Sequence, residues 1–228
     1  GKGLYEQGTA PEQWRLPSGS SVSMSINASQ SRLWENHLGR SAAFWDRWLP
    51  RARELFPPLK NWSVSDLLGS VNRPAFSFIR VEADELTYDL HIILRFELER
   101  RLVDGELKVA DLPEAWNARF KELSGLQVPD PAQGCLQDIH WAMGAIGYFP
   151  TYTLGNILAA QLFAAANQDP TVSRGIESGD YLPLRDWMRR EIHAHGSRYL
   201  PNELIMRATG KPSDPTDYLA HLRSRYRN

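Results

Sequence analysis

The chain has 228 residues, of which 42% are hydrophobic and 23% charged, and a formal net charge of −1 at neutral pH. This length and composition are typical of a globular protein with one or two domains and a substantial core. The near-zero charge argues against a nucleic-acid or anionic-membrane partner, and the single cysteine, Cys135, excludes an intrachain disulfide framework. No apolar run is long enough to span a membrane and no signal-like start occurs, so we expect a cytoplasmic location.

The first third of the chain reads as a loop followed by helices. Pro11, Pro17 and Gly19 predict a loop over residues 9–19. One long helix is expected over about 21–56, where Pro57 and Pro58 end it. Its predicted buried stripe consists of Leu33, Trp34, Leu38, Phe44, Trp45, Trp48, Leu49 and Leu55. Ser63 or Ser65 is a candidate N-cap for a short helix through Leu68.

The remainder of the chain also follows helical patterns. Apolar residues within 79–99 repeat with a helical period, and Asp104–Gly105 marks the end of that helix. Asp111 is a candidate cap for a helix that ends near Gly125. Further helices are expected over 154–167, after Asp169, over 184–195 and around 217–219. No useful length of β alternation occurs, so the sequence predicts a single all-α domain over residues 1–228.

Several side chains have both a chemical and a structural interpretation. From the residues alone, Arg80 is expected to form a structural ion pair, with Glu82 or Asp84 or with another residue along the helix. His91 lies among apolar neighbours and is interpreted as a core residue. Cys135 has no base partner in the sequence, so a nucleophilic role is not expected. His193 and His195 are two residues apart and therefore on different helix faces, which argues against a metal pair.

Three blocks of the sequence resemble a known family. They are residues 26–41, 79–99 and 134–156. The first contains the run Ala28-Ser-Gln-Ser-Arg-Leu-Trp-Glu-Asn36, the second the element Ile79-Arg80 to Ala83-Asp84, and the third the run Gly134-Cys-Leu-Gln-Asp-Ile-His-Trp141 with its continuation from Gly147 to Asn156. In this order they resemble the C-terminal half of the carboxypeptidase Taq family, zinc metallocarboxypeptidases of the glutamate-zincin class. The resemblance covers essentially the whole chain. It implies an all-α half-shell of helices around a central groove.

The resemblance also assigns roles to residues of this chain. His140, Tyr148 and Tyr152 would face the scissile carbonyl and stabilise the oxyanion formed in peptide hydrolysis. Arg80 and Gln137 would contact substrate, with Arg80 directed at a peptide C-terminal carboxylate. The structural alternative is that the aromatic turn around Tyr148 and Tyr152 only packs helices together.

The zinc-ligand positions of that family differ here. The start, Gly1-Lys-Gly-Leu-Tyr-Glu-Gln-Gly8, resembles the end of the family's His-Glu-x-Gly-His motif, with Lys2 in the place of the second zinc histidine. The third ligand of the family, a glutamate, is replaced by Ala28. The first histidine and the catalytic glutamate would precede Gly1. Because a zinc ion of this class needs three protein ligands, we expect no zinc cofactor.

The leading hypothesis from the sequence is a metallocarboxypeptidase homologue without catalytic activity of its own, a pseudoenzyme that retains some binding of peptide C-termini. Whether the chain is an enzyme stays open, because the missing motif residues would have to come from another polypeptide. A further alternative is an interaction module whose groove face forms a homodimer or pairs with a separate N-terminal half.

Overall fold

The structure, a computed structural model, describes residues 1–227. Within that range every regular element is a helix and no strand occurs, so the all-α prediction is confirmed. The contacts between Cα atoms divide the chain into two compact units. The first consists of Gly1–Asn72 and the chain from Leu154 onward, and the second is Arg73–Thr153. Each unit is described by itself, and the expectation of a single domain stays a prediction.

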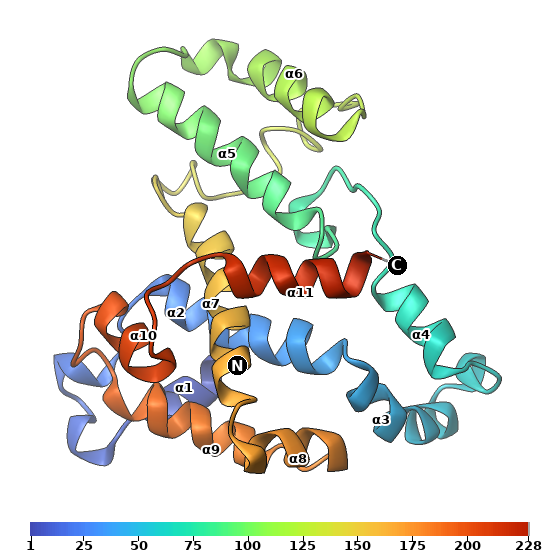
Figure 1. Cartoon of the computed structure of the whole chain (residues 1–228). Coiled ribbons are helices and arrows are strands. Elements are labelled where there is room, and N and C mark those ends of the chain that lie inside the picture. The colour runs from blue at the N-terminus through green and yellow to red at the C-terminus, as the bar shows by residue number, and fades with distance from the viewer. Residues whose placement is uncertain (228) are drawn as a thin grey trace. The chain divides into compact units, whose positions relative to one another are not determined.

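The first unit combines helices from both ends of the chain (Figure 1). They are α1 (Lys2–Gly8), α2 (Met24–Arg32), the π-helix η3 (Leu33–Gly39), α3 (Ala42–Leu55), α4 (Val64–Val71), most of α7 (Pro150–Ala166), α8 (Pro170–Ser178), α9 (Leu182–Glu191), α10 (Pro201–Thr209) and α11 (Thr216–Tyr226). Short 3₁₀ turns lie between them at η1 (Pro11–Gln13), η2 (Pro17–Gly19), η4 (Pro57–Leu59) and η7 (His193–His195).

The prediction of one long helix over 21–56 is wrong. The π-helical stretch η3 interrupts it, and a new helix, α3, begins after Ser41. The Ser41 hydroxyl accepts a hydrogen bond from the Phe44 amide (3.2 Å), which favours a fresh N-terminus over continuation. The interruption also changes which side chains are buried. Leu33, Leu38 and Leu49 are buried as expected, whereas Trp48 and Leu55 are 37% and 56% exposed.

Several helix ends follow the predicted capping chemistry. Ser63 and Asp66 form a reciprocal capping box at the start of α4. The Asp169 side chain accepts from the Thr171 amide at the start of α8, and Gly125 ends α6 (Leu112–Ser124) in the left-handed conformation. Asp111 precedes α6 as predicted, but its side chain makes no capping hydrogen bond.

The core of the first unit joins α1, α2, η3, α7, α9 and α10. Its buried members include Tyr5, Ile26, Leu33, Leu38, Leu158, Leu162, Leu184, Met188, Ile192 and Leu204. Burying one such side chain contributes about 1.5–3 kcal/mol to folding. This cluster therefore fixes α1 and α2, the two helices that contain Lys2 and Ala28, against the rest of the unit.

The second unit consists of η5 (Arg80–Glu82), α5 (Tyr88–Val103), η6 (Val109–Asp111), α6 (Leu112–Ser124) and the start of α7. The helices α5 and α6 lie side by side (Figure 1) over a core of Leu94, Leu98, Trp116 and Phe120. The predicted helix over 79–99 begins only at Tyr88, although it ends where expected. The reason is Asp84, whose carboxylate accepts the amides of Leu86 and Thr87 and so forms a turn.

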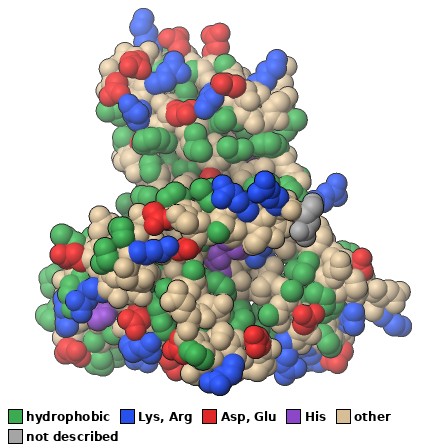
Figure 2. Space-filling model, in the orientation of Figure 1, with side chains coloured by type: hydrophobic (Ala, Val, Ile, Leu, Met, Phe, Trp, Pro, Cys, Tyr) green, Lys and Arg blue, Asp and Glu red, His purple; other side chains and the backbone are tan. Residues whose placement is uncertain are grey.

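The visible surface mixes both signs of charge among apolar side chains (Figure 2), as the net charge of −1 leads one to expect. Over residues 1–227, none of the helices combines the length and the apolar character that crossing a membrane requires.

Two glycines of α1 test how tightly this helix packs. A Cβ added at Gly8 would lie 2.5 Å from the Cβ of His193, whereas one at Gly3 would meet nothing within 4 Å. His193 has little freedom to move, because it bonds Gln30 (2.8 Å) and stacks on Tyr5. We therefore expect Gly8→Ala to lower the free energy of unfolding by about 1–3 kcal/mol.

The matched control is Gly3→Ala, which we expect to leave stability unchanged or to raise it by up to about 1 kcal/mol because alanine favours a helix. Urea denaturation of both variants measures the difference. Equal stabilities would contradict the close packing of α1 on His193.

Candidate functional site

The predicted site residues lie in the second unit, around a segment without regular structure. Residues 127–149 contain turns but no helix, and Gly144 and Gly147 adopt positive φ values of 72° and 79°. Without a backbone ladder, such a segment depends on side-chain hydrogen bonds for a fixed shape. Three side chains provide most of them: Asp138, Gln137 and Glu99.

Asp138 lies between two buried arginines. Its Oδ1 accepts from Arg80 Nη2 (2.7 Å), and its Oδ2 accepts from Arg95 Nε (2.7 Å). Arg95 is fully buried and Arg80 is 6% exposed. Burial alone raises the pKa of Asp138, but hydrogen bonds and charge from the two arginines outweigh it, so this pKa lies below its ordinary value. Asp138 is therefore ionised at neutral pH and fixes the 134–149 segment to η5 and α5.

The Arg80 side chain is held on every side. Besides Asp138, its Nη1 donates to the Tyr88 hydroxyl (3.0 Å), and its guanidinium lies 4.9 Å from the centre of the Tyr152 ring. The ion-pair alternative drawn from the sequence named Glu82 or Asp84 as partner, and the observed partner is Asp138. Its substrate-side role stays a prediction.

Gln137 uses both ends of its amide within the protein. Its Oε1 accepts from the Arg80 amide (2.8 Å), and its Nε2 donates to the carbonyl oxygens of Phe78 (2.9 Å), Gln133 (3.0 Å) and Gly134 (3.1 Å). These bonds join the segment before η5 to the segment after α6. They give Gln137 a structural role, and the expectation that it also binds substrate stays a prediction.

Glu99 is a contributor that the sequence analysis missed. This buried carboxylate accepts from Trp141 Nε1 (2.8 Å) and from the Gly147 amide. A glutamate on the buried side of an otherwise apolar helix pattern was the available signal, because such a group requires partners.

His140, Tyr148 and Tyr152 lie close together in the second unit, and their role toward a scissile carbonyl stays a prediction. His140 Nε2 lies 3.0 Å from the Tyr152 hydroxyl, and the His140 and Tyr148 ring centres are 5.2 Å apart. The three side chains project from the end of the irregular segment and the first turn of α7. Phe149 is fully buried, and its ring packs against that of His140 with the ring centres 4.4 Å apart.

His140 and Tyr152 are neutral at physiological pH. Burial lowers the pKa of His140, with Arg80 and Arg95 acting in the same direction and Asp138 against them. Burial also raises the pKa of Tyr152 to about 12. A neutral imidazole and a neutral phenol are hydrogen-bond donors suited to an uncharged carbonyl oxygen or to the oxyanion derived from it. The cluster can thus orient a carbonyl.

Lys2 and Ala28 lie in the first unit. Lys2 is exposed in the first turn of α1. Ala28 is in α2, where its methyl group lies 3.0 Å from a Cβ built on Gly155 of α7. Neither a lysine ammonium nor a methyl group has a lone pair for a metal ion.

Cys135 is buried, and burial raises the pKa of its thiol. A thiol that is less acidic than usual is a poor nucleophile, in agreement with the sequence analysis.

Comparison with known proteins places these residues in a family context. A family model described as carboxypeptidase Taq (M32) metallopeptidase matches residues 1–226. Thermostable carboxypeptidase 1 of Thermus thermophilus is 48% identical, over 99% of this chain and 44% of the relative's length. Carboxypeptidase 1 of Bacillus subtilis is 38% identical, over 100% of this chain and 46% of the relative's length. The crystal structure of the M32 carboxypeptidase from Deinococcus radiodurans has a TM-score of 0.95 at 43% identity, covering 99% of this chain and 46% of that one.

The chain spans less than half the length of the curated relatives that it matches. A resemblance to their C-terminal half fits this coverage.

The buried charge group predicts a specific acid sensitivity. Replacing Asp138 by asparagine leaves Arg80 and Arg95 without their counter-charge, and we expect a loss of about 3–5 kcal/mol in the free energy of unfolding at pH 7. Because the pKa of Asp138 is lower in the folded than in the unfolded state, its stabilisation is present above the unfolded value near pH 4 and is lost as pH falls towards the folded value.

Urea unfolding from pH 3 to pH 7 should therefore show a smaller loss of stability on acidification for Asp138→Asn than for the unsubstituted chain. Asp111→Asn is the control, because Asp111 is exposed and makes no capping bond. Similar effects of the two substitutions would contradict the structural role given to Asp138.

Proposed function

This chain belongs to the carboxypeptidase Taq (M32) metallopeptidase family, and from that premise we propose that it binds peptide C-termini without hydrolysing them. The observation that carries the proposal is the pair Lys2 and Ala28, which the family resemblance aligns with two zinc-ligand positions. A cytoplasmic location is part of the proposal, and cell fractionation tests it.

The chemistry of these two side chains does not fit a zinc ion. Catalytic zinc is held by three protein ligands such as imidazoles and a carboxylate. The Lys2 ammonium would repel the cation, and the Ala28 methyl group provides no donor atom. No hydrolytic step is therefore derived for this chain.

The second unit supports the binding half of the proposal. His140 Nε2 and the Tyr152 hydroxyl share one hydrogen bond (3.0 Å), and Tyr148 lies beside them. In this proposal His140 donates that bond and so orients the Tyr152 hydroxyl, and the Tyr148 and Tyr152 hydroxyls donate to a carbonyl oxygen near the C-terminus of a peptide. The two arginines act indirectly: Asp138 binds both Arg80 and Arg95 and offsets one of their two positive charges, and the Arg80 guanidinium lies against the Tyr152 ring. The same proposal includes a contact between Arg80 and the C-terminal carboxylate of the peptide.

A second candidate function is an interaction module. Four apolar side chains of the segment beside His140 are strongly exposed, namely Leu136 (72%), Ile139 (68%), Met143 (71%) and Ile146 (56%). Such a cluster commonly marks a protein contact. Its partner would be a second copy of the chain or a polypeptide that corresponds to the other half of the relatives. A molecular mass that rises with concentration would favour the first, and a constant monomer mass would argue against it.

Turnover is the first test. We expect no release of C-terminal amino acids from N-blocked dipeptides, with or without added zinc or cobalt, because two of the zinc-ligand positions lack donor atoms. The D. radiodurans relative, assayed in parallel, serves as a positive control. Metal-dependent turnover by this chain would overturn the non-catalytic half of the proposal.

Peptide binding is the second test, measured by calorimetry with one peptide as the free acid and as the C-terminal amide. We expect the free acid to bind more tightly and Tyr148→Phe to weaken its binding about two- to tenfold, the value of one hydrogen bond. Tyr199→Phe, which removes a hydroxyl in the first unit, is the matched control. Equal affinities for all variants and both peptides would contradict the proposed peptide binding and favour the interaction module.

A further inference from the structure

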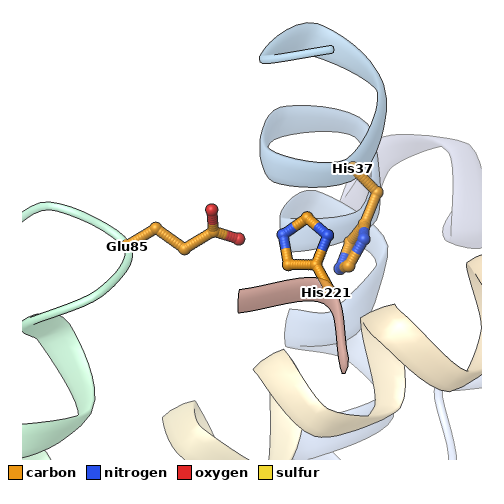
Figure 3. A group of neighbouring side chains, drawn as sticks. All are labelled: His37, Glu85 and His221. Carbon is orange, nitrogen blue, oxygen red and sulfur yellow. The ribbon is translucent and has the colours of Figure 1, made fainter. Parts of the chain in front are cut away.

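Two histidines that lie far apart in the sequence meet in the first unit. His37 comes from the π-helix η3 and His221 from α11 (Figure 3). Their ring centres are 4.1 Å apart with the planes at 47°, and each offers a ring nitrogen within 4.8 Å of the other. Glu85, also drawn in Figure 3, belongs to the second unit.

His37 is held firmly in place. Its side chain is 6% exposed and stacks on Phe163 of α7, with ring centres 5.3 Å apart and planes at 28°. It lies in a seven-residue π-helical stretch, a distortion that is frequent at functional sites. The neighbouring Asn36 is buried, and its Oδ1 has no hydrogen-bond partner among the described residues.

His221 is less buried, and contacts on both sides of it fix its helix. Tyr218, one turn before it, is buried, and Lys211 pairs with Asp217 (2.8 Å). One turn after it, Arg225 donates to the carbonyl oxygen of Asn36 (2.8 Å). These contacts attach α11 beside η3, so the two imidazoles are brought together by the fold itself.

We propose that His37 and His221 form a binding site for a divalent transition-metal ion of the zinc type. Neutral imidazole nitrogens are preferred ligands of zinc, copper and nickel ions. Two nitrogens on one tetrahedral zinc ion lie about 3.3 Å apart, which a small rotation of the more exposed His221 ring provides. Water completes the coordination. The positive charge of Arg225 lowers the affinity, and its bond to the Asn36 carbonyl occupies part of that guanidinium.

The test is a zinc titration of the full chain, free of any polyhistidine tag, by isothermal calorimetry at pH 7.5. We expect one zinc ion per chain with a Kd on the order of 10 µM, weaker than a site with four protein ligands. His221→Gln should weaken binding at least tenfold and abolish the zinc-dependent rise in Tm. This variant changes the less buried ring, and circular dichroism confirms that it is folded.

His195→Gln is the matched control, because His195 is also partly exposed in the first unit and packs edge-on against an aromatic ring, Tyr199. It should bind zinc like the unsubstituted chain. Unchanged binding by His221→Gln, equal losses in both variants, or no saturable binding up to about 1 mM zinc would each overturn the proposal. The inference does not rest on the proposed function, since its readout is binding and not turnover.

Discussion

The second unit depends on one buried arrangement of charge, Asp138 between Arg80 and Arg95. A carboxylate and two guanidinium groups carry a large desolvation cost, which their mutual attraction offsets only if the geometry is kept. The three groups come from η5, α5 and the irregular 134–149 segment. Fixing their mutual positions therefore fixes the segment, and with it the backbone that presents His140. Gln137 and Glu99 also fix this segment, since the hydrogen bonds of each join it to another part of the unit.

This arrangement changes how the family-like motif around Asp138 is interpreted. The side chains of Gln137, Asp138 and Trp141 are all bonded to protein groups. They would be needed for the fold of this segment whether or not a reaction takes place. In His140, Tyr148 and Tyr152 the side chains lie against one another, and the contact of His140 with Asp138 is a 3.9 Å approach of its Nδ1 to Asp138 Oδ1. The match to the family at Gln137, Asp138 and Trp141 is therefore evidence for a shared fold. Only the match at His140, Tyr148 and Tyr152 is relevant to a shared chemical function.

Much of the local structure could be predicted from the sequence, because it depends on near neighbours. Ser63, Asp169 and Gly125 act within a few residues of their positions, and the apolar period of 154–167 is enough to define α7. The π-helix η3 was missed because its residues fit an ordinary helical pattern. The late start of α5 was missed because the carboxylate of Asp84 competes with the helix for backbone amides. Local patterns do not rank such competing hydrogen bonds.

The candidate site was harder to predict because its bonds are long-range. Arg80 was assigned acidic neighbours two and four residues away, yet its partner lies 58 residues along the chain. Nothing in the local sequence pattern shows which of these carboxylates pairs with Arg80. Asp138 is the partner because it can be buried together with a second arginine, Arg95. The same limit applies to His37 and His221, which share no motif and meet only because α11 packs beside η3. A motif search finds ligands spaced along one helix. Side chains brought together by packing are found only once the fold is known, so the chemistry of a chain that departs from its family's motif has to be sought in its packing.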